Sequence, residues 1–180
     1  MDLIYHNLDQ VKNDMPAPYA LSKASTVPSV IGGALWADNV NKVIYQYGGQ
    51  FVDAARDFDT MFAYDTLLNR WNETAVKSAY RQRPAWGAST VAEDQGYAYY
   101  LGGWMSSNST LGYTDQPRAS NRLIRFDMNN GEFSNVGTIP GGKGRAEGAL
   151  LYIPASDSGL LVYFGGVETP YDNSTVMGVR

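Results

Sequence analysis

The chain has 180 residues, a formal net charge of −4, 13 Tyr, 19 Gly and no Cys. The missing cysteine excludes disulfides, thiolate catalysis and cysteine-bound metals, and without a cluster of Lys or Arg we expect neither nucleic acid nor an anionic membrane as a partner. Abundant Tyr and Gly with few charges favour short strands and turns, so the composition predicts an all-β fold.

The N-terminal segment is not expected to be a signal peptide. Its first ten residues, MDLIYHNLDQ, include an acid at Asp2 and lack the basic start and apolar run of a signal peptide. No stretch of the chain approaches the ~18 apolar residues of a membrane span. His6 is the only histidine, so we expect neither a histidine-rich metal centre nor a Ser-His-Asp triad.

An apolar run that ends in two glycines occurs three times. VIYQYGG, YAYYLGG and LLVYFGG end at Gly48–Gly49, Gly102–Gly103 and Gly165–Gly166, at intervals of 54 and 63 residues. A period of about 50 residues with a terminal double glycine is typical of kelch-type propeller blades. We expect each pair to end a second strand, because glycine can leave the strand with positive φ where blades crowd together.

A second motif follows the first two glycine pairs. In both copies an aromatic residue and an aspartate are followed, six residues after the aspartate, by another aromatic residue: Tyr64, Asp65 and Trp71; Phe126, Asp127 and Phe133. A helix over 58–72 is the alternative, but Asn129-Asn130-Gly131 in the second copy favours a hairpin turn. The motif predicts third and fourth strands joined by a turn that the aspartate initiates, with Trp71 and Phe133 in the wedge between blades.

Each repeat is therefore predicted to be a four-stranded antiparallel meander. Short polar turns separate its first two strands, as at 93–96 and 156–159. The predicted fold is a kelch-type β-propeller fragment of about two and a half to three such blades. We expect a tail of a preceding blade at 1–27, complete blades at 28–77 and 84–137, and an incomplete blade at 145–180.

The stretches PSVIGGALWAD, YLGGW, GRAEGALLYIPASDSGLLVYFGGV and PYDNST resemble the kelch-repeat family, and within it fungal kelch-repeat proteins of the cell surface. The resemblance covers about residues 28–175 and implies a propeller of typically six or seven blades and an extracellular or cell-surface parent protein. The chain would then be a piece of a larger propeller, from a truncated gene model or a shortened product. Open blade edges in such a piece favour self-association.

The sequence offers little support for catalysis. GTIPGGKG, residues 137–144, has the spacing of a phosphate-binding loop, but Gly144 replaces the Ser or Thr that holds Mg²⁺, so we expect an interblade loop. Arg145 and Glu147 are expected to make an interblade hydrogen bond or salt bridge, with a pocket as the alternative. Galactose-oxidase-type enzymes carry similar blades, but their copper site needs two His and a Cys–Tyr pair. No metal or cofactor is predicted.

The long connections share one end of the meander, because successive turns alternate between its two ends. They span 50–59, 75–86, 104–120 and 137–147, and we name this the long-loop end. Rigid scaffolds position such loops for recognition, so this end is the predicted binding face. Since Trp, Tyr and Arg dominate interaction hot spots, its candidate contacts are Phe51, Arg81, Arg83, Trp104 and Arg118.

These observations predict a non-enzymatic binding module whose ligand is a protein or a carbohydrate. The alternatives are a fragment of a galactose-oxidase-like enzyme whose catalytic residues lie outside this chain, and a non-functional truncation. Asn72, Asn108 and Asn173 each begin an N-glycosylation acceptor triplet, which matters if the chain is secreted. Asn108 and Asn173 fall at the long-loop end, where glycans would hinder a protein partner.

Overall fold

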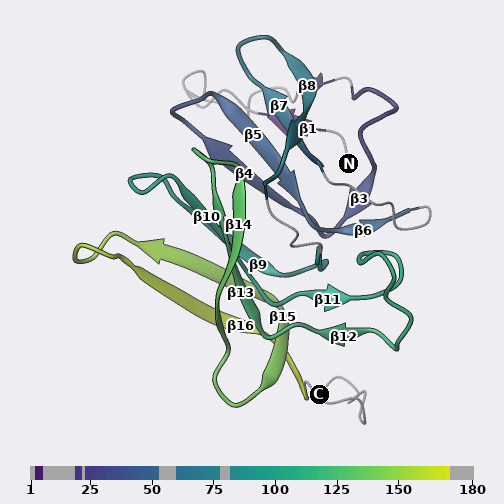
Figure 1. Ribbon diagram of the computed structural model, residues 1–180, viewed down its shortest axis with the longest axis vertical. Helices are drawn as coiled ribbons and strands as arrows, with labels where there is room; N and C mark the ends of the chain where they lie inside the picture. Colours follow the sequence, from purple (N-terminus) through teal and green to yellow (C-terminus); the bar gives the residue numbers. More distant parts are fainter. Residues whose placement is uncertain (1–2, 6–18, 22, 53–59, 78–81, 171–180) are drawn as a thin grey trace, which may run out of the picture.

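The computed structural model describes residues 3–5, 19–21, 23–52, 60–77 and 82–170. These residues form strands and turns and no helix, which confirms the predicted all-β class (Figure 1). Within these ranges no helix is therefore long and apolar enough to cross a membrane. Two four-stranded antiparallel sheets, each a blade, make up the centre of the molecule.

The first blade has the strand order β4 (Ala34–Asp38), β5 (Val43–Tyr47), β7 (Thr60–Asp65) and β8 (Arg70–Ala75). The side chains of β4 alternate between buried and exposed, as expected of a strand whose one face is covered. Much of the segment 58–72, for which a helix was the alternative, is a β-hairpin in which Tyr64 pairs with Trp71.

The second blade repeats this order with β9 (Ala88–Ala92), β10 (Tyr97–Leu101), β13 (Arg122–Asp127) and β14 (Glu132–Thr138). The Tyr-rich run is the interior strand β10, which pairs with β9 on one edge and with β13 on the other. Both of its edges are therefore occupied by backbone hydrogen bonds.

An aspartate fixes the turn between the third and fourth strands of each blade. Asp65 Oδ1 accepts hydrogen bonds from the amides of Leu67 and Leu68, both at 2.9 Å. Asp127 Oδ1 accepts from the amides two and three residues on, and its Oδ2 accepts from the side chain of Asn130 at 2.8 Å. Such a carboxylate replaces the backbone acceptors that a turn lacks. The two aspartates are thus held in place by local turn geometry.

The long-loop end contains short strands that were not predicted from the sequence. β3 (Val30–Ile31) pairs with β6 (Gln50–Phe51), and β11 (Trp104–Met105) pairs with β12 (Arg118–Ala119). The segment 137–147 is also mostly strand, because β14 runs to Thr138 and the next strand begins at Lys143. Figure 1 shows β6, β11 and β12 gathered at one end of the blades.

A two-stranded half blade follows, made of β15 (Lys143–Ile153) and β16 (Leu160–Pro170). The prediction that Gly165 and Gly166 end a strand is wrong, because β16 continues through them to Pro170. The physical reason is that the segment after the glycines also pairs with β15, at its start. In the first blade the equivalent pairing is between the separate short strands β3 and β6, whereas here the two pairings form one continuous ladder. Both glycines still have positive φ, 72° and 76°.

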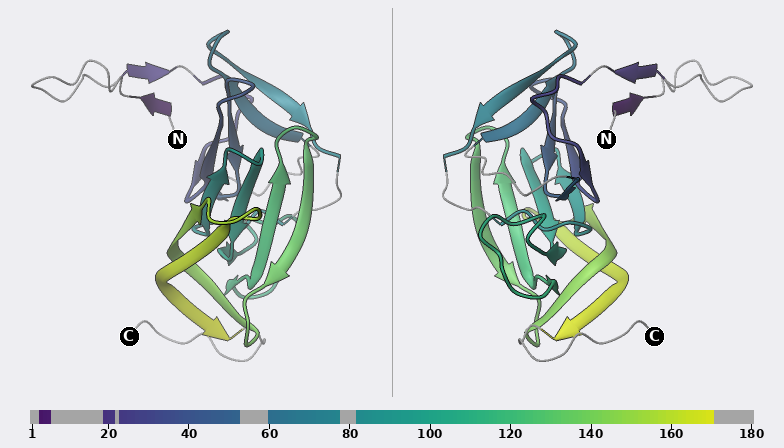
Figure 2. Two further views of the ribbon diagram at one scale, coloured as in Figure 1. Left: turned by 90° about the vertical axis from the view of Figure 1, so that its left-hand side faces the viewer. Right: turned by 90° about the vertical axis from the view of Figure 1, so that its right-hand side faces the viewer.

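A separate hairpin precedes the first blade. β1 (Leu3–Tyr5) pairs with β2 (Tyr19–Leu21) in antiparallel register. Figure 2 shows this hairpin standing away from the sheets. The blade boundaries at 1–27, 28–77, 84–137 and 145–180 stay predictions.

Aromatic side chains form the core between the two blades. The ring of Trp36 stacks on Tyr47 at 4.7 Å and on Phe126 at 5.8 Å, measured between centroids, and Tyr47 lies 5.2 Å from Phe133. Trp36 and Phe126 are fully buried. Phe133 thus lies between the blades, whereas Trp71 packs edge-on against Tyr64 of its own sheet at 5.6 Å. Stacked and edge-on pairs of this kind add to the free energy gained from burial.

The first two glycine pairs carry a repeated contact between neighbouring blades. The amide of Gly49 donates to the Pro84 carbonyl at 3.1 Å, and the amide of Gly103 donates to the Arg145 carbonyl at 2.8 Å. A Cβ atom at Gly48 would come within 2.5 Å of the Pro84 oxygen, and one at Gly102 would overlap the Arg145 oxygen. We call this the interblade glycine contact. It explains why the Tyr-rich strands end in two residues without side chains.

Candidate functional site

A ladder of backbone hydrogen bonds runs across the blades at the long-loop end. Gly32, Trp86 and Glu147 occupy equivalent positions, each with φ near +60° and each followed by Gly-Ala. The amide of Trp86 donates to the Gly32 carbonyl, and the amide of Glu147 donates to the Trp86 carbonyl, both at 2.7 Å. The ladder fixes the backbone position of Trp86, and thereby the place where its indole emerges.

The indole of Trp86 lies on the first blade. A Cβ atom at Gly32 would come within 2.6 Å of the Trp86 ring, so the ring occupies the space that a side chain at Gly32 would fill. The Trp86 residue nevertheless remains 38% exposed. A large aromatic side chain is thus held in a defined place while part of its surface faces solvent, which is the arrangement that recognition surfaces use.

Trp104 lies beside it. Its backbone pairs with Ala85, the residue before Trp86, through hydrogen bonds of 2.9 and 2.6 Å. Its indole Nε1–H donates to Glu147 Oε1 at 2.9 Å, which joins the second blade to the half blade. Trp104 is half-buried, so this hydrogen bond restricts the ring without removing it from solvent. Two tryptophans from neighbouring segments are thereby oriented at one end of the molecule.

The loop between β11 and β12 is stiffened by hydroxyl groups. Ser109 is buried, and its Oγ accepts from the amide of Ser106 at 3.0 Å and donates to the Trp104 carbonyl at 3.2 Å. Arg118 lies over the ring of Tyr113 at 5.9 Å from the centroid. The loop also contacts the first blade, because the amide of Phe51 donates to the Asn108 carbonyl at 2.9 Å. The long-loop end is therefore cross-linked rather than open.

The structure brings some of the predicted contact residues together. Trp104 and Arg118 lie on the paired strands β11 and β12, and Arg83 is half-buried just before Trp86. Phe51 is only 8% exposed, so it anchors the loops instead of presenting a surface. Arg81 lies outside the described residues.

The acceptor triplets fall in different surroundings. Asn108 is exposed at the long-loop end, and Asn72 is half-buried within β8. Asn173 lies outside the described residues. Of the three, Asn108 is the one that bears on the candidate site, because it lies in the loop that follows Trp104.

Trp86 was not among the residues predicted from the sequence. Its signal is the repeated Gly-Ala, which lies at the start of β4 and of β9, at 33–34 and 87–88, and within β15, at 148–149. The residue before each Gly-Ala adopts positive φ, and Trp86 is the bulky residue that stands where the first copy has glycine. Tryptophan rarely adopts the left-handed backbone conformation, because its side chain is strained there. A tryptophan at the repeat position where the first copy has glycine could therefore have indicated a functional residue.

Charged groups at this end are engaged with one another. Lys143 Nζ and Arg145 Nη2 each lie 2.5 Å from a carboxylate oxygen of Glu168. The hydrogen bond from Lys143, with the charge of Arg145, holds the pKa of the Glu168 carboxyl below its usual value. Arg145 therefore pairs within the β15–β16 hairpin, and Glu147 makes the contact between blades.

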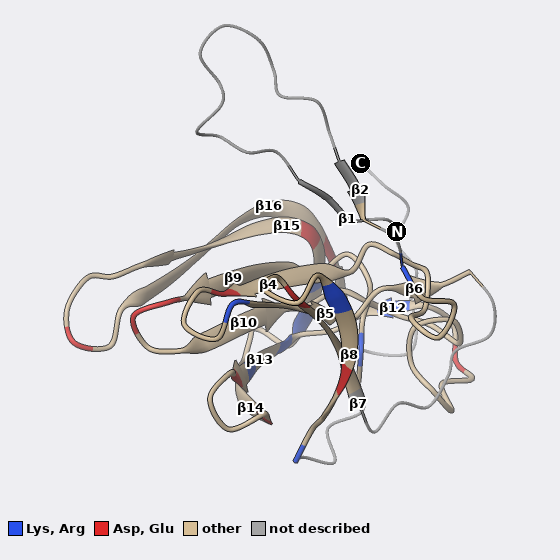
Figure 3. Ribbon diagram, turned by 90° about the horizontal axis from the view of Figure 1, so that it is seen from above, with Lys and Arg blue, Asp and Glu red and all other residues tan. Residues whose placement is uncertain are grey.

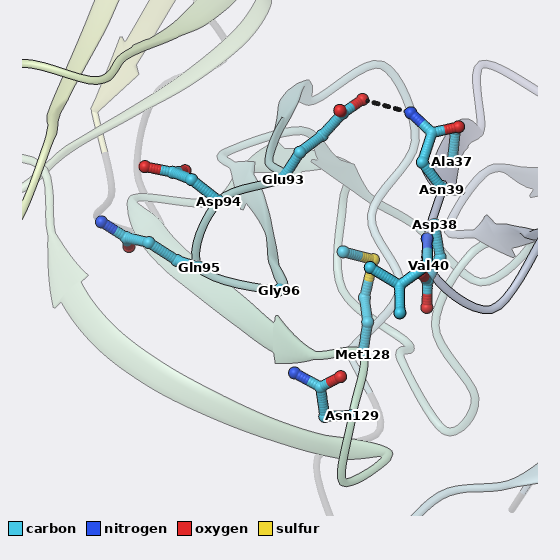
Figure 4. A pocket seen from close by; sticks show the side chains of 10 residues that line it. All are labelled: Ala37, Asp38, Asn39, Val40, Glu93, Asp94, Gln95, Gly96, Met128 and Asn129. Carbon is cyan, nitrogen blue, oxygen red and sulfur yellow. Dashed lines mark hydrogen bonds between the residues drawn. The ribbon is translucent and has the colours of Figure 1, made fainter.

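A shallow pocket of about 280 Å³ lies at the opposite end, where the short turns meet (Figure 4). Turns of both blades line it, and Asn39 Nδ2 donates to Glu93 Oε1 across it at 2.8 Å. Its acids are occupied, since Asp38 accepts from the amides of Val40 and Asn41. Figure 3 shows that the β9–β10 and β15–β16 turns near this end are acidic. The pocket contains no exposed aromatic side chain and is the weaker candidate.

Comparisons with known proteins support the fold. No family model matches the sequence, and no curated protein matches it. Among solved structures, the chain is similar to the structure of YjhT, a kelch-type propeller protein, with a TM-score of 0.62 and 15% sequence identity. The match covers 92% of this chain and 60% of that one, so the chain spans less than two thirds of the neighbour's length. At this identity the likeness shows the propeller fold alone.

Proposed function

We propose that the chain is a non-enzymatic recognition module whose long-loop end binds a protein partner. The observation that carries the proposal is Trp86, a tryptophan held over Gly32 by the backbone ladder and still 38% exposed. Trp and Arg are the residue types that contribute most to binding energy at interfaces, and Trp104 and Arg118 accompany Trp86 at this end.

The rigidity of this end supports the proposal. Binding is weakened when side chains must be ordered on contact, at about 0.5–1.5 kcal/mol for each flexible side chain. Trp104 is already fixed by Glu147, and the loop that follows is fixed by Ser109. A partner can therefore bind this aromatic surface without the free-energy cost of ordering its side chains.

The chemistry of this end also favours binding over catalysis. The described ranges contain no group of three or more His, Cys, Asp and Glu that could hold a metal ion. Glu147, which binds the Trp104 indole, and Glu168 in the neighbouring β15–β16 hairpin are both engaged by hydrogen bonds or ion pairs. The exposed acceptor triplet at Asn108 supports a secreted or cell-surface setting for the parent protein.

A displayed random-peptide library tests the proposal. The purified chain should enrich peptides whose affinity falls at least tenfold in the Trp86→Ala variant, because loss of a hot-spot side chain costs ≥ 2 kcal/mol, a factor of about thirty. Leu67→Ala is the matched control, since Leu67 is 75% exposed on the turn between β7 and β8 at the opposite end.

Two results would contradict the proposal. One is enrichment of peptides that bind the wild type and the Trp86→Ala variant equally well. The other is an array of neutral oligosaccharides that binds the chain through Trp86 while no peptide does, because the ligand would then be a carbohydrate. Circular dichroism of each variant verifies that the fold is kept.

A further inference from the structure

The third glycine pair lacks the contact that the first two make. Gly48 and Gly102 each lie against the carbonyl of a following blade. Gly165 has the same backbone conformation, with φ of +72° against +65° and +71°, yet no heavy atom of the described chain lies within 4 Å of its Cβ position. The half blade therefore carries a glycine pair whose first residue meets no blade among the described residues.

The sheet face beside Gly165 is apolar and exposed. Ala149 pairs with Phe164 as Ala34 pairs with Tyr47, so Phe164 is equivalent to Tyr47, and Leu151 is equivalent to Trp36. Trp36 and Tyr47 are 0% and 2% exposed because the next blade covers them, whereas Leu151 and Phe164 are 51% and 53% exposed. The same face that forms the core between the first two blades is thus open on the half blade.

We propose that this face binds the first blade of a second copy of the chain. The acceptor in each interblade glycine contact lies two residues before the positive-φ residue of the ladder: Pro84 before Trp86, and Arg145 before Glu147. Val30 has this position before Gly32, and among the described residues no glycine amide donates to the Val30 carbonyl. The first blade of a second copy therefore carries the complementary half of the contact, which continues the interface already present twice within one chain.

The strand count is compatible with closure. Among the described strands, β16 pairs with β15 alone, and the β1–β2 hairpin pairs with no other element. In both complete blades a third strand pairs with the second, so β1 of the second copy would pair with the free edge of β16. Each copy then supplies two full blades and two half blades, and two copies supply six blades, within the about four to eight of closed propellers. Closure removes the open edges, which are association hazards.

Light scattering after size exclusion at about 100 μM tests the proposal, with a replacement at Gly165. The wild-type chain should have twice the mass of one chain. Gly165→Ala should weaken the dimer at least tenfold, because its Cβ atom would overlap the Val30 carbonyl of the second copy. Gly112→Ala is the matched control, since Gly112 also has φ of +72° and nothing within 4 Å of its Cβ position. Its dimer should be as tight as that of the wild type.

A second pair of variants separates misfolding from loss of contact. Leu151→Asp should give a folded monomer by circular dichroism, and Leu111→Asp, in the exposed β11–β12 loop of the second blade, should remain a dimer. A photo-crosslinker at position 164 should label residues 28–51 of the other copy. A wild-type monomer, equal effects at Gly165 and Gly112, an open series of larger species, or crosslinks to another blade would each overturn the proposal.

Discussion

The hydroxyl group of Tyr100 joins the interior strand β10 to the segment that leads into the second blade. Its Oη–H donates to the Pro84 carbonyl at 2.7 Å and accepts a hydrogen bond from the amide of Gly87, also at 2.7 Å. The side chain is fully buried between the blades. Burial raises the pKa of the Tyr100 phenol far above its usual value, and the Gly87 amide offsets only part of that increase.

Replacing Tyr100 by Phe should lower the free energy of unfolding by about 1–3 kcal/mol, because the half-buried Gly87 amide loses its acceptor and the Pro84 carbonyl keeps only the Gly49 amide as a donor. Tyr97→Phe is the control on the same strand, since the half-buried Tyr97 packs its ring under Arg125 at 4.5 Å and would keep that contact. Urea denaturation of the three proteins measures the difference. Equal stabilities of the two variants would contradict the role assigned to the hydroxyl.

The raised pKa of the Tyr100 phenol also predicts how the stability of the fold changes at alkaline pH. A group whose pKa is raised on folding contributes stability that is present below its unfolded pKa, about 10 for tyrosine, and that is lost as the pH rises further. The wild type should therefore lose stability above about pH 10 more steeply than Tyr100→Phe does. Denaturation midpoints between neutral and alkaline pH provide the measurement.

The pKa of Asp127 is shifted in the opposite direction, and it predicts how the stability of the fold changes at acidic pH. Partial burial alone would raise the pKa of its carboxyl, but hydrogen bonds from the side chain and amide of Asn130 and from the amide of Asn129 outweigh burial and lower the pKa. A lowered pKa contributes stability above the unfolded value, about 3.9, that is lost as the pH falls through the folded value. The stability difference between wild type and Asp127→Asn should thus shrink below about pH 4.

Acid titration of the unfolding midpoint measures this difference. Asp115→Asn, in the exposed loop between β11 and β12, is the control for removal of one negative charge. A difference between the wild type and Asp127→Asn that stays constant down to about pH 2 would contradict the linkage argument.

At the scale of the elements, the interblade glycine contact decides where β5 and β10 end. Gly102→Ala should be more destabilising than Gly112→Ala by about 1–3 kcal/mol, the usual cost of forcing extra atoms into a packed site. Both positions have positive φ, 71° and 72°, so the strain of the left-handed conformation is matched. Only Gly102 faces a backbone carbonyl, that of Arg145. Thermal unfolding of both variants gives the comparison, and similar midpoints would show that conformation alone selects glycine here.

The elements that recur in the sequence were those that could be predicted from it. The meander, the Tyr-rich interior strand and the all-β class follow from patterns that appear two or three times. The two-residue strands β3 and β6 could not be predicted, because their pairing depends on where the loops return in space. The continuation of β16 through Gly165 was missed for the same reason.

The candidate site was predicted in outline. The long-loop end and Trp104 could be found from the alternation of turns, but the burial of Phe51 depends on its contact with Asn108 from another blade. Trp86 was missed because its exposure depends on a ladder that crosses three repeats. Local sequence predicts which loops meet, and the contacts between blades determine which side chains remain on the surface.

At the scale of the whole molecule, the chain is an arc in which each blade is fixed to the next at two places. The aromatic core holds the faces of the first two blades together, and an apolar cluster around Leu101 and Leu150 joins the second blade to the half blade. The glycine contact holds the long-loop ends together at both interfaces. Blade faces are covered at both interfaces within the arc, and an equivalent face is exposed on the half blade, where Leu151 and Phe164 lie. Both proposals use this geometry, one at the long-loop end and the other at the exposed face.

Amide hydrogen exchange at the glycine pairs tests the blade arrangement most directly, because it reports the hydrogen bonds between blades one by one. The amides of Gly49 and Gly103 should exchange slowly, since they donate to the Pro84 and Arg145 carbonyls of the following blade. The amides of Gly141 and Gly142, in the exposed turn between β14 and β15, should exchange fast. If Gly49 and Gly103 exchange as fast as Gly141 and Gly142 in the folded chain, the blades do not meet through their glycine pairs and the account is wrong.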